Sequence, residues 1–131
     1  MESKKPKILH VEDNDIILKL MKRILSDDFE LKQSSTLEDA LSIIQNKDFD
    51  VYISDGDYPS RGKESWKILY DSIKKINPSA NFIVFSGDYG ICERAESLKI
   101  KAFRKADMKD IFVIPDYIKK ILKYQKNSER F

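Results

Sequence analysis

Hydrophobic and polar residues alternate along the chain in blocks that predict short strands separated by longer amphipathic helices. Mostly apolar runs, typical of buried strands, occur at Lys7–Val11, Phe49–Ser54 and Asn81–Phe85, with weaker candidates at Glu30–Ser34 and Ala102–Arg104. Segments with apolar residues at helical spacing follow each of them. Five strands alternating with five helices predict an α/β domain, in which a parallel sheet is covered by helices on both faces.

The helices are marked by their apolar stripes and by start and stop signals. We expect them over Asn14–Asp27, over the segment that carries Leu37 to Ile44, over Trp66–Ile76, over Ile91–Leu98, and around the isoleucines from Ile111 to Ile121. Thr36 and Asp39, three apart, are typical of a capping box. Asn77 precedes Pro78, and a residue before proline avoids helical angles, so the third helix should stop there.

Pro115 is awkward in the last helix, because proline is tolerated only in a helix's first turn. The helix is therefore expected either to begin nearer Ile114 than Lys109 or to be kinked. The 131 residues fit a single domain, 1–131, with a core over about 6–124 and a polar, frayed tail over 125–131.

Composition excludes several classes of protein. The 24 basic and 22 acidic residues leave a net charge of only +2, which gives no case for a nucleic-acid footprint. A single cysteine, Cys92, excludes an internal disulfide and indicates a reducing compartment. No apolar run approaches the ~20 residues of a membrane span, and the charged start MESKKPK is unlike a signal peptide. We expect a cytoplasmic protein, a monomer or weak dimer.

The candidate chemistry lies where the strands end. Right-handed crossovers favour a doubly wound sheet, which places its sites at the carboxyl ends of the strands. Residues of complementary chemistry follow four of the strands: Glu12, Asp13, Asp55, Ser86 and Lys105. Three crowded carboxylates raise one another's pKa unless a cation lies between them, and Mg²⁺ prefers oxygen ligands. With a lysine and a hydroxyl at the same edge, this pattern predicts metal-assisted phosphoryl transfer at a carboxylate.

The same segments, KILHVEDND, VYISDGDYPSRGKE, FIVFSGD and AFRKAD, resemble in this order the CheY-like receiver domains of two-component response regulators. The resemblance covers essentially the whole chain. It implies a flavodoxin-like, doubly wound five-stranded parallel sheet of order 2-1-3-4-5. By this resemblance Asp55 is the phosphoryl acceptor, Glu12 and Asp13 hold Mg²⁺ directly or through water, and the backbone carbonyl of Asp57 is a further ligand.

The resemblance also implies partners and a response. Ser86 would bond a phosphoryl oxygen, and Lys105 would pair with the phosphoryl group or with Asp55. A sensor histidine kinase or a histidine phosphotransfer protein would donate the phosphoryl group in a phosphorelay. The receiver is not otherwise an enzyme: it assists its own phosphorylation and usually its dephosphorylation. Phosphorylation biases the face formed by the helix at 91–98, the strand at 102–104 and the last helix, where a downstream target protein would dock.

Three positions depart from the family pattern. Ala106 follows Lys105 where many receivers have a cis-proline, so this peptide is expected to be trans. The switch aromatic usually stands three residues before the lysine, at Ala102 here, whereas Phe103 is two before it. Gly62 also comes one residue early in the loop that Gly56 and Pro59 shape. The chemistry of a receiver is retained, and the aromatic switch is in question.

Three other functions stay open. A pseudo-receiver would keep the fold as a phosphorylation-independent binding module. Asp55 and Asp57 also resemble the DxD of aspartate-nucleophile phosphatases, but there the acidic metal pair follows the DxD, whereas Glu12 and Asp13 precede it. A flavin-binding protein would need a phosphate-cradling loop after the first strand, where this chain has two acids. If the chain is natural in length, it is a stand-alone receiver, although it could also be part of a larger regulator or hybrid kinase.

Overall fold

The computed structural model describes residues 5–58 and 64–129, which form five strands and five helices in strict alternation. The strands are β1 (Lys7–Val11), β2 (Glu30–Ser34), β3 (Val51–Ser54), β4 (Asn81–Ser86) and β5 (Lys101–Arg104). The helices are α1 (Asp15–Leu25), α2 (Leu37–Asn46), α3 (Trp66–Ile76), α4 (Tyr89–Ser97) and α5 (Met108–Glu129). All neighbouring strands pair in parallel, in the order β2-β1-β3-β4-β5. The expected fold class and strand order are confirmed.

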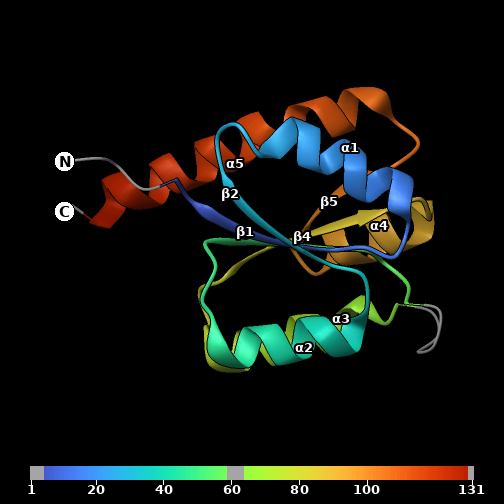
Figure 1. The fold of residues 1–131 in the computed structure, drawn as a ribbon, viewed down its shortest axis with the longest axis horizontal. Coiled ribbons are helices and arrows are strands. Elements are labelled where there is room, and N and C mark those ends of the chain that lie inside the picture. Colours follow the sequence, from blue (N-terminus) through green and yellow to red (C-terminus); the bar gives the residue numbers. More distant parts are fainter. Residues whose placement is uncertain (1–4, 59–63, 130–131) are drawn as a thin grey trace.

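The elements form three layers, with the sheet in the middle (Figure 1). Helices α1 and α5 cover one face, and α2, α3 and α4 cover the other. Because side chains alternate along a strand, each strand contributes to both cores. In β1, Ile8 packs on the α1/α5 side and Leu9 on the α2/α3/α4 side. This double burial explains why the central strands read as continuous apolar runs.

Local signals set most helix ends. The Asn14 side chain accepts hydrogen bonds from the backbone of Ile16 and Ile17, and the Thr36 hydroxyl accepts one from Asp39, 3.0 Å away. The Thr36 start of α2 is therefore confirmed, although the Asp39 carboxylate binds the Ser34 hydroxyl. Helix α3 ends before Asn77, as the proline at 78 predicts. Apart from α5, the expected boundaries differ from the observed ones by at most two residues, as at β3.

Helix α5 runs through Pro115. Of the two expected alternatives, a start nearer Ile114 is wrong, since the helix begins at Met108; the kink stays a prediction. Proline removes one backbone donor, which costs several kcal/mol in a helix interior, but Ile111, Ile114 and Ile118 are buried against the sheet and offset that loss. The helix continues to Glu129, so residues 125–129 are helical where a frayed tail was expected.

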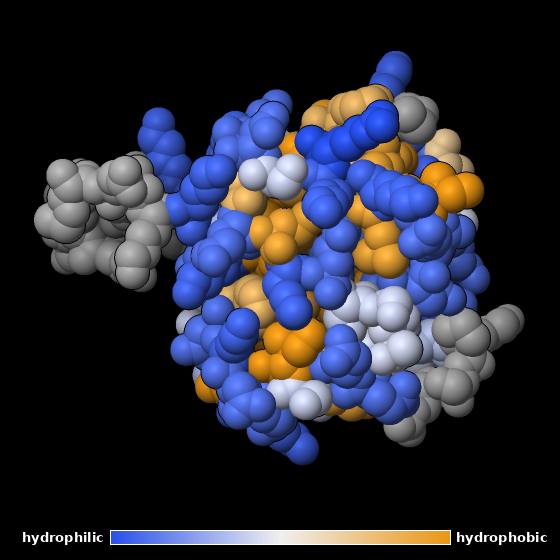
Figure 2. Space-filling view, in the orientation of Figure 1, coloured by the Kyte–Doolittle hydropathy of each residue, from blue (hydrophilic) through white to orange (hydrophobic). Residues whose placement is uncertain are grey.

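The surface shown in Figure 2 is mainly hydrophilic, with apolar side chains in small, separated patches. This view looks onto the side of the molecule where α1, β2 and α2 lie in front (Figure 1). No helix in the described part of the chain is both long enough and apolar enough to cross a membrane.

Candidate functional site

Four of the predicted side chains meet at the carboxyl ends of the strands. Glu12 and Asp13 follow β1, Asp55 follows β3, and Lys105 follows β5. Carboxylate oxygens of Glu12, Asp13 and Asp55 all lie within 4.8 Å of one another. The strand order brings them together, because β1 and β3 are adjacent although about forty residues separate them in sequence.

Lys105 supplies the cation of this cluster. Its Nζ lies 2.7 Å from Glu12 Oε1 and donates hydrogen bonds to Glu12 Oε2 at 2.9 Å and to Asp55 Oδ1 at 3.0 Å. The backbone N–H of Gly56 also donates to Asp55 Oδ1, at 2.7 Å. Glu12 is fully buried, Asp55 is 7% exposed, and Asp13 is exposed. Among the three carboxylates, Asp13 is therefore the one that is open to solvent.

Burial and mutual repulsion govern the ionisation of the cluster. Burial, followed by the charge of Asp55, raises the pKa of Glu12 to about 7, despite the hydrogen bond from Lys105. Burial likewise raises the pKa of Asp55, although Lys105 acts in the opposite direction. Burial lowers the pKa of Lys105, but its bonds to Glu12 and Asp55 outweigh burial and raise it overall. Lys105 thus stays charged at neutral pH, but its single positive charge does not balance the charge of three ionised carboxylates.

The residues present fit a divalent cation. Three carboxylates face one ammonium group, so the cluster keeps an excess of negative charge when all are ionised. Their oxygens are the ligands that Mg²⁺ prefers, and the exposed Asp13 leaves room for metal-bound water. Glu12, Asp13 and Asp55 are therefore the residues that would hold Mg²⁺.

Ser86 reaches the edge of the site but does not bond to the carboxylates. Its hydroxyl accepts the backbone N–H of Asp88 at 3.0 Å, at the start of α4. The same hydroxyl lies against Gly56: a Cβ at residue 56 would stand 2.7 Å from Ser86 Oγ and 2.9 Å from Ile91 Cγ2. Only glycine fits directly after Asp55 with Ser86 and α4 in these positions.

Asp57 is held by its side chain as well as by its peptide. Its Oδ1 accepts the backbone N–H of Glu64, across the loop that leads to α3. That carboxylate is therefore used inside the loop, and the backbone carbonyl remains the candidate metal ligand. Pro59 and Gly62, which were expected to shape this loop, lie outside the described residues.

Phe103 is placed away from the site. It packs on the α1/α5 side of the sheet, with its ring centroid 5.5 Å from that of Tyr117. Ala102 occupies the opposite side, facing α4, in the core that contains Ile91. The aromatic ring of Phe103 is thus on the face of β5 opposite Ala102 and α4. The described residues contain no cis peptide, so the bond before Ala106 is trans, as expected.

His10 is fully buried in β1, and its side chain makes one hydrogen bond among the described residues. Its Nδ1 lies 3.2 Å from the amide nitrogen of Gln33, which also donates to the carbonyl of Leu18. No described residue bonds its Nε2. Burial, and then the charge of Lys105, lowers the pKa of His10 to about 3. His10 is therefore a neutral core residue at physiological pH.

Three hydroxyl groups support the segment after β3 and were not anticipated from the sequence. The Tyr58 hydroxyl, buried on the α3 side, lies 2.6 Å from Ser54 Oγ, which donates to the carbonyl of Asp55. Ser65 Oγ accepts the backbone N–H of Tyr58 at 2.6 Å. No periodicity or motif marks these serines, because their partners are set by how the loop folds back.

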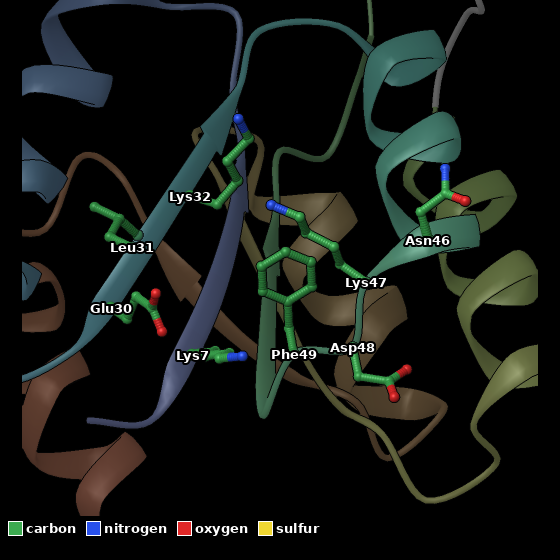
Figure 3. Close-up of a pocket in the computed structure, with 8 residues that line it drawn as sticks. All are labelled: Lys7, Glu30, Leu31, Lys32, Asn46, Lys47, Asp48 and Phe49. Atoms are coloured by element: carbon green, nitrogen blue, oxygen red, sulfur yellow. The ribbon is translucent and has the colours of Figure 1, made fainter. Parts of the chain in front are cut away.

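A hollow of about 470 Å³ lies at the other end of the sheet, between β2 and the end of α2 (Figure 3). Its walls carry both signs of charge, with Phe49 between them; the charged residues are Lys7, Glu30, Lys32, Lys47 and Asp48. All five are exposed. None of them is within ion-pair distance of another in the described structure. It shares no residue with the carboxylate cluster.

Comparison with known proteins identifies the fold. No protein-family model matches the chain, and neither does any curated protein. A response regulator receiver domain from Clostridium thermocellum is 28% identical, with a TM-score of 0.70, over 89% of this chain and 98% of that one. A CheY-like receiver domain from Methanospirillum hungatei is 24% identical, with a TM-score of 0.76, over 96% and 99%. The BeF3-activated receiver domain of DrrB is 21% identical, with a TM-score of 0.75, over 91% and 98%.

These structures align over nearly their whole length and nearly the whole of this chain. The chain therefore has the fold of response regulator receiver domains, and the resemblance inferred from its four strand-end segments is confirmed. Receiver-domain neighbours and the acidic cluster together support a signalling role for this chain.

Proposed function

We propose that this protein is a phosphoryl-accepting receiver of a two-component or phosphorelay system, and that Asp55 is its acceptor. One observation carries the proposal: Asp55 pairs with the Lys105 ammonium group and lies within 4.8 Å of the carboxylates of Glu12 and Asp13, at the carboxyl edge of the sheet. A buried cluster of this kind is costly to maintain, so a role for it is expected.

The chemistry follows from the arrangement. An oxygen of Asp55 attacks the phosphorus of the donor, and a P–O bond forms while the P–N bond of a phosphohistidine breaks. The electron pair leaves with the imidazole nitrogen. Mg²⁺, when bound, would neutralise charge on the phosphoryl oxygens. Lys105 places a second positive charge beside Asp55, and the Ser86 hydroxyl, which accepts the Asp88 N–H, would donate its own proton in a hydrogen bond to a phosphoryl oxygen.

The donor would be a sensor histidine kinase or a histidine phosphotransfer protein. A target protein would dock on the face formed by α4, β5 and α5, and phosphorylation would bias that face toward its active arrangement. The site is adjacent to this face, because Ser86 bonds the start of α4 and the backbone N–H of Lys105 donates to the carbonyl of Ser86.

The placement of Phe103 favours a second candidate, a pseudo-receiver that binds partners without being phosphorylated. In this structure Phe103 lies on the face of β5 opposite Ala102 and α4. Ser86 bonds the start of α4, so Phe103 and Ser86 do not share a face of the sheet. Retention of Glu12, Asp13, Asp55 and Lys105 in one cluster supports the phosphorylated receiver more strongly.

Intact mass after incubation with acetyl phosphate and Mg²⁺ tests the proposal. The wild type should gain one phosphoryl group, and Asp55→Ala and an EDTA-treated sample should not. If the wild type binds Mg²⁺ and gains no mass, the pseudo-receiver is the better description.

A further inference from the structure

The start of α3 is joined to the segment after Asp55 by three hydrogen bonds in succession. Glu64 N–H donates to Asp57 Oδ1 at 2.5 Å, Tyr58 N–H donates to Ser65 Oγ at 2.6 Å, and Trp66 N–H donates to the Gly56 carbonyl at 3.3 Å. Each of residues 56–58 is thus hydrogen-bonded to a different residue of 64–66. We call these contacts the loop clasp.

Ser65 has an unusual part in the loop clasp. It occupies the N-cap position of α3, where a serine hydroxyl ordinarily accepts an N–H of the helix's own first turn. Here its φ and ψ are −64° and −10°, and its side chain makes no capping hydrogen bond. The hydroxyl is buried, at 3% residue exposure, and turns to Tyr58 of the other segment. The helix therefore gives up its usual cap in favour of a contact across the loop.

That contact determines the direction of the Asp57 carbonyl. The peptide between Asp57 and Tyr58 is trans, and in a planar trans peptide the N–H and the C=O point in opposite directions. Because Ser65 holds the Tyr58 N–H on the α3 side, the carbonyl of Asp57 faces away from α3. The Tyr58 ring is fixed too, since its hydroxyl lies 2.6 Å from Ser54 Oγ, so this peptide cannot rotate freely.

We propose that Ser65 is a positioning residue for the metal site: it accepts the Tyr58 N–H and thereby directs the Asp57 carbonyl toward the cation held by Glu12, Asp13 and Asp55. This inference rests on the proposed function, in which that cation is Mg²⁺. It also gives the Asp57 side chain a separate task, closing the loop through Glu64.

Mg²⁺ affinity, measured by calorimetric titration of the full chain, tests this role. Ser65→Ala should raise the dissociation constant about tenfold, as expected on losing a group that orients a ligand. Ser65→Thr keeps the hydroxyl and should restore most of the affinity. The matched control is Ser34→Ala, which removes an equally buried serine hydroxyl whose partners are in the α2 cap; its Mg²⁺ affinity should stay within about twofold of the wild type.

A second readout separates positioning from loss of structure. Urea unfolding in EDTA should show comparable destabilisation for Ser65→Ala and Ser34→Ala, while their Mg²⁺ affinities differ. With acetyl phosphate, Ser65→Ala should need more Mg²⁺ for half-maximal phosphorylation but reach nearly the wild-type rate at saturation.

The outcomes distinguish the two proposals. Equal Mg²⁺ affinity in the wild type and Ser65→Ala, or equal weakening in Ser34→Ala, overturns the role of Ser65 and leaves the receiver function intact. No Mg²⁺ binding by the wild type overturns the proposed function and this inference together.

Discussion

At the carboxyl ends of the strands, Glu12 is fully buried and bonded to Lys105, whereas at the amino ends Lys7, Lys32 and Glu30 stand exposed around the hollow of Figure 3. Both ends carry carboxylates and lysines. An exposed charge keeps its hydration and contributes little to stability. A buried charge costs several kcal/mol unless it is paired. The same residue types therefore indicate a site at one end of the sheet and a solvated surface at the other.

The largest expected difference between the two ends is in phosphoryl acceptance. Asp55→Asn should abolish mass gain from acetyl phosphate and Mg²⁺, because the acceptor oxygen is replaced by an amide nitrogen or a neutral carbonyl. Asp48→Asn, at the amino end, should leave it unchanged. Intact-mass spectrometry measures both, and phosphorylation of Asp55→Asn at the wild-type level would remove the distinction.

The second difference is in stability. Lys105→Met removes the cation between Glu12 and Asp55 and should lower the free energy of unfolding by about 3 kcal/mol at pH 8 in EDTA. Lys32→Met, on the exposed wall of the hollow, should change it by less than about 0.5 kcal/mol. At pH 5 the loss at Lys105 should shrink, because a Glu12 pKa of about 7 means that this carboxyl is then protonated.

Urea denaturation of both lysine variants measures these free energies of unfolding. An equal decrease in Lys105→Met and Lys32→Met would show that burial at the carboxyl end does not determine how much a lysine contributes to stability.

A third difference is the room for a side chain at two glycines near the carboxyl ends of the strands, Gly56 and Gly87. Gly56→Ala would put a Cβ 2.7 Å from Ser86 Oγ and 2.9 Å from Ile91 Cγ2, and should destabilise the fold by about 2 kcal/mol. Gly87→Ala meets no atom within 4 Å and serves as the control. Thermal unfolding of both variants measures the contrast, and a neutral Gly56→Ala would mean that Ser86 and α4 move easily.

The smallest effect is a pH dependence from His10. Its pKa is about 3 in the folded protein and about 6.5 when unfolded, so below pH 6.5 the unfolded chain takes up a proton that the folded chain does not. Stability should therefore fall by roughly 1.5 kcal/mol between pH 6.5 and pH 5 from this residue alone.

Glu12 acts in the opposite sense, because its raised pKa stabilises the folded state as pH falls from about 7. His10→Gln keeps Glu12 and Lys105, so the difference between wild type and variant isolates His10. Unfolding free energies in EDTA at the two pH values measure it, and parallel pH profiles would contradict a neutral, buried His10.

Much of the fold followed from local pattern. The alternation of apolar runs and helical stripes predicted all five strands and five helices, since side-chain periods of 2 and 3.6 are properties of the backbone itself. The same pattern placed Glu12, Asp55 and Lys105 at strand ends. Pro115 was misleading, because its local penalty is offset by isoleucines that pack against a distant part of the chain.

The candidate site divides in the same way. The sequence by itself determined which side chains stand at the carboxyl edge, because parallel strands bring their ends to one side. Only the tertiary structure decided that Glu12 is buried against Lys105, that Phe103 lies on the face away from Ala102, and that Ser65 bonds Tyr58. Burial, register between strands and contacts across a loop depend on residues far apart in sequence, and no local period records them.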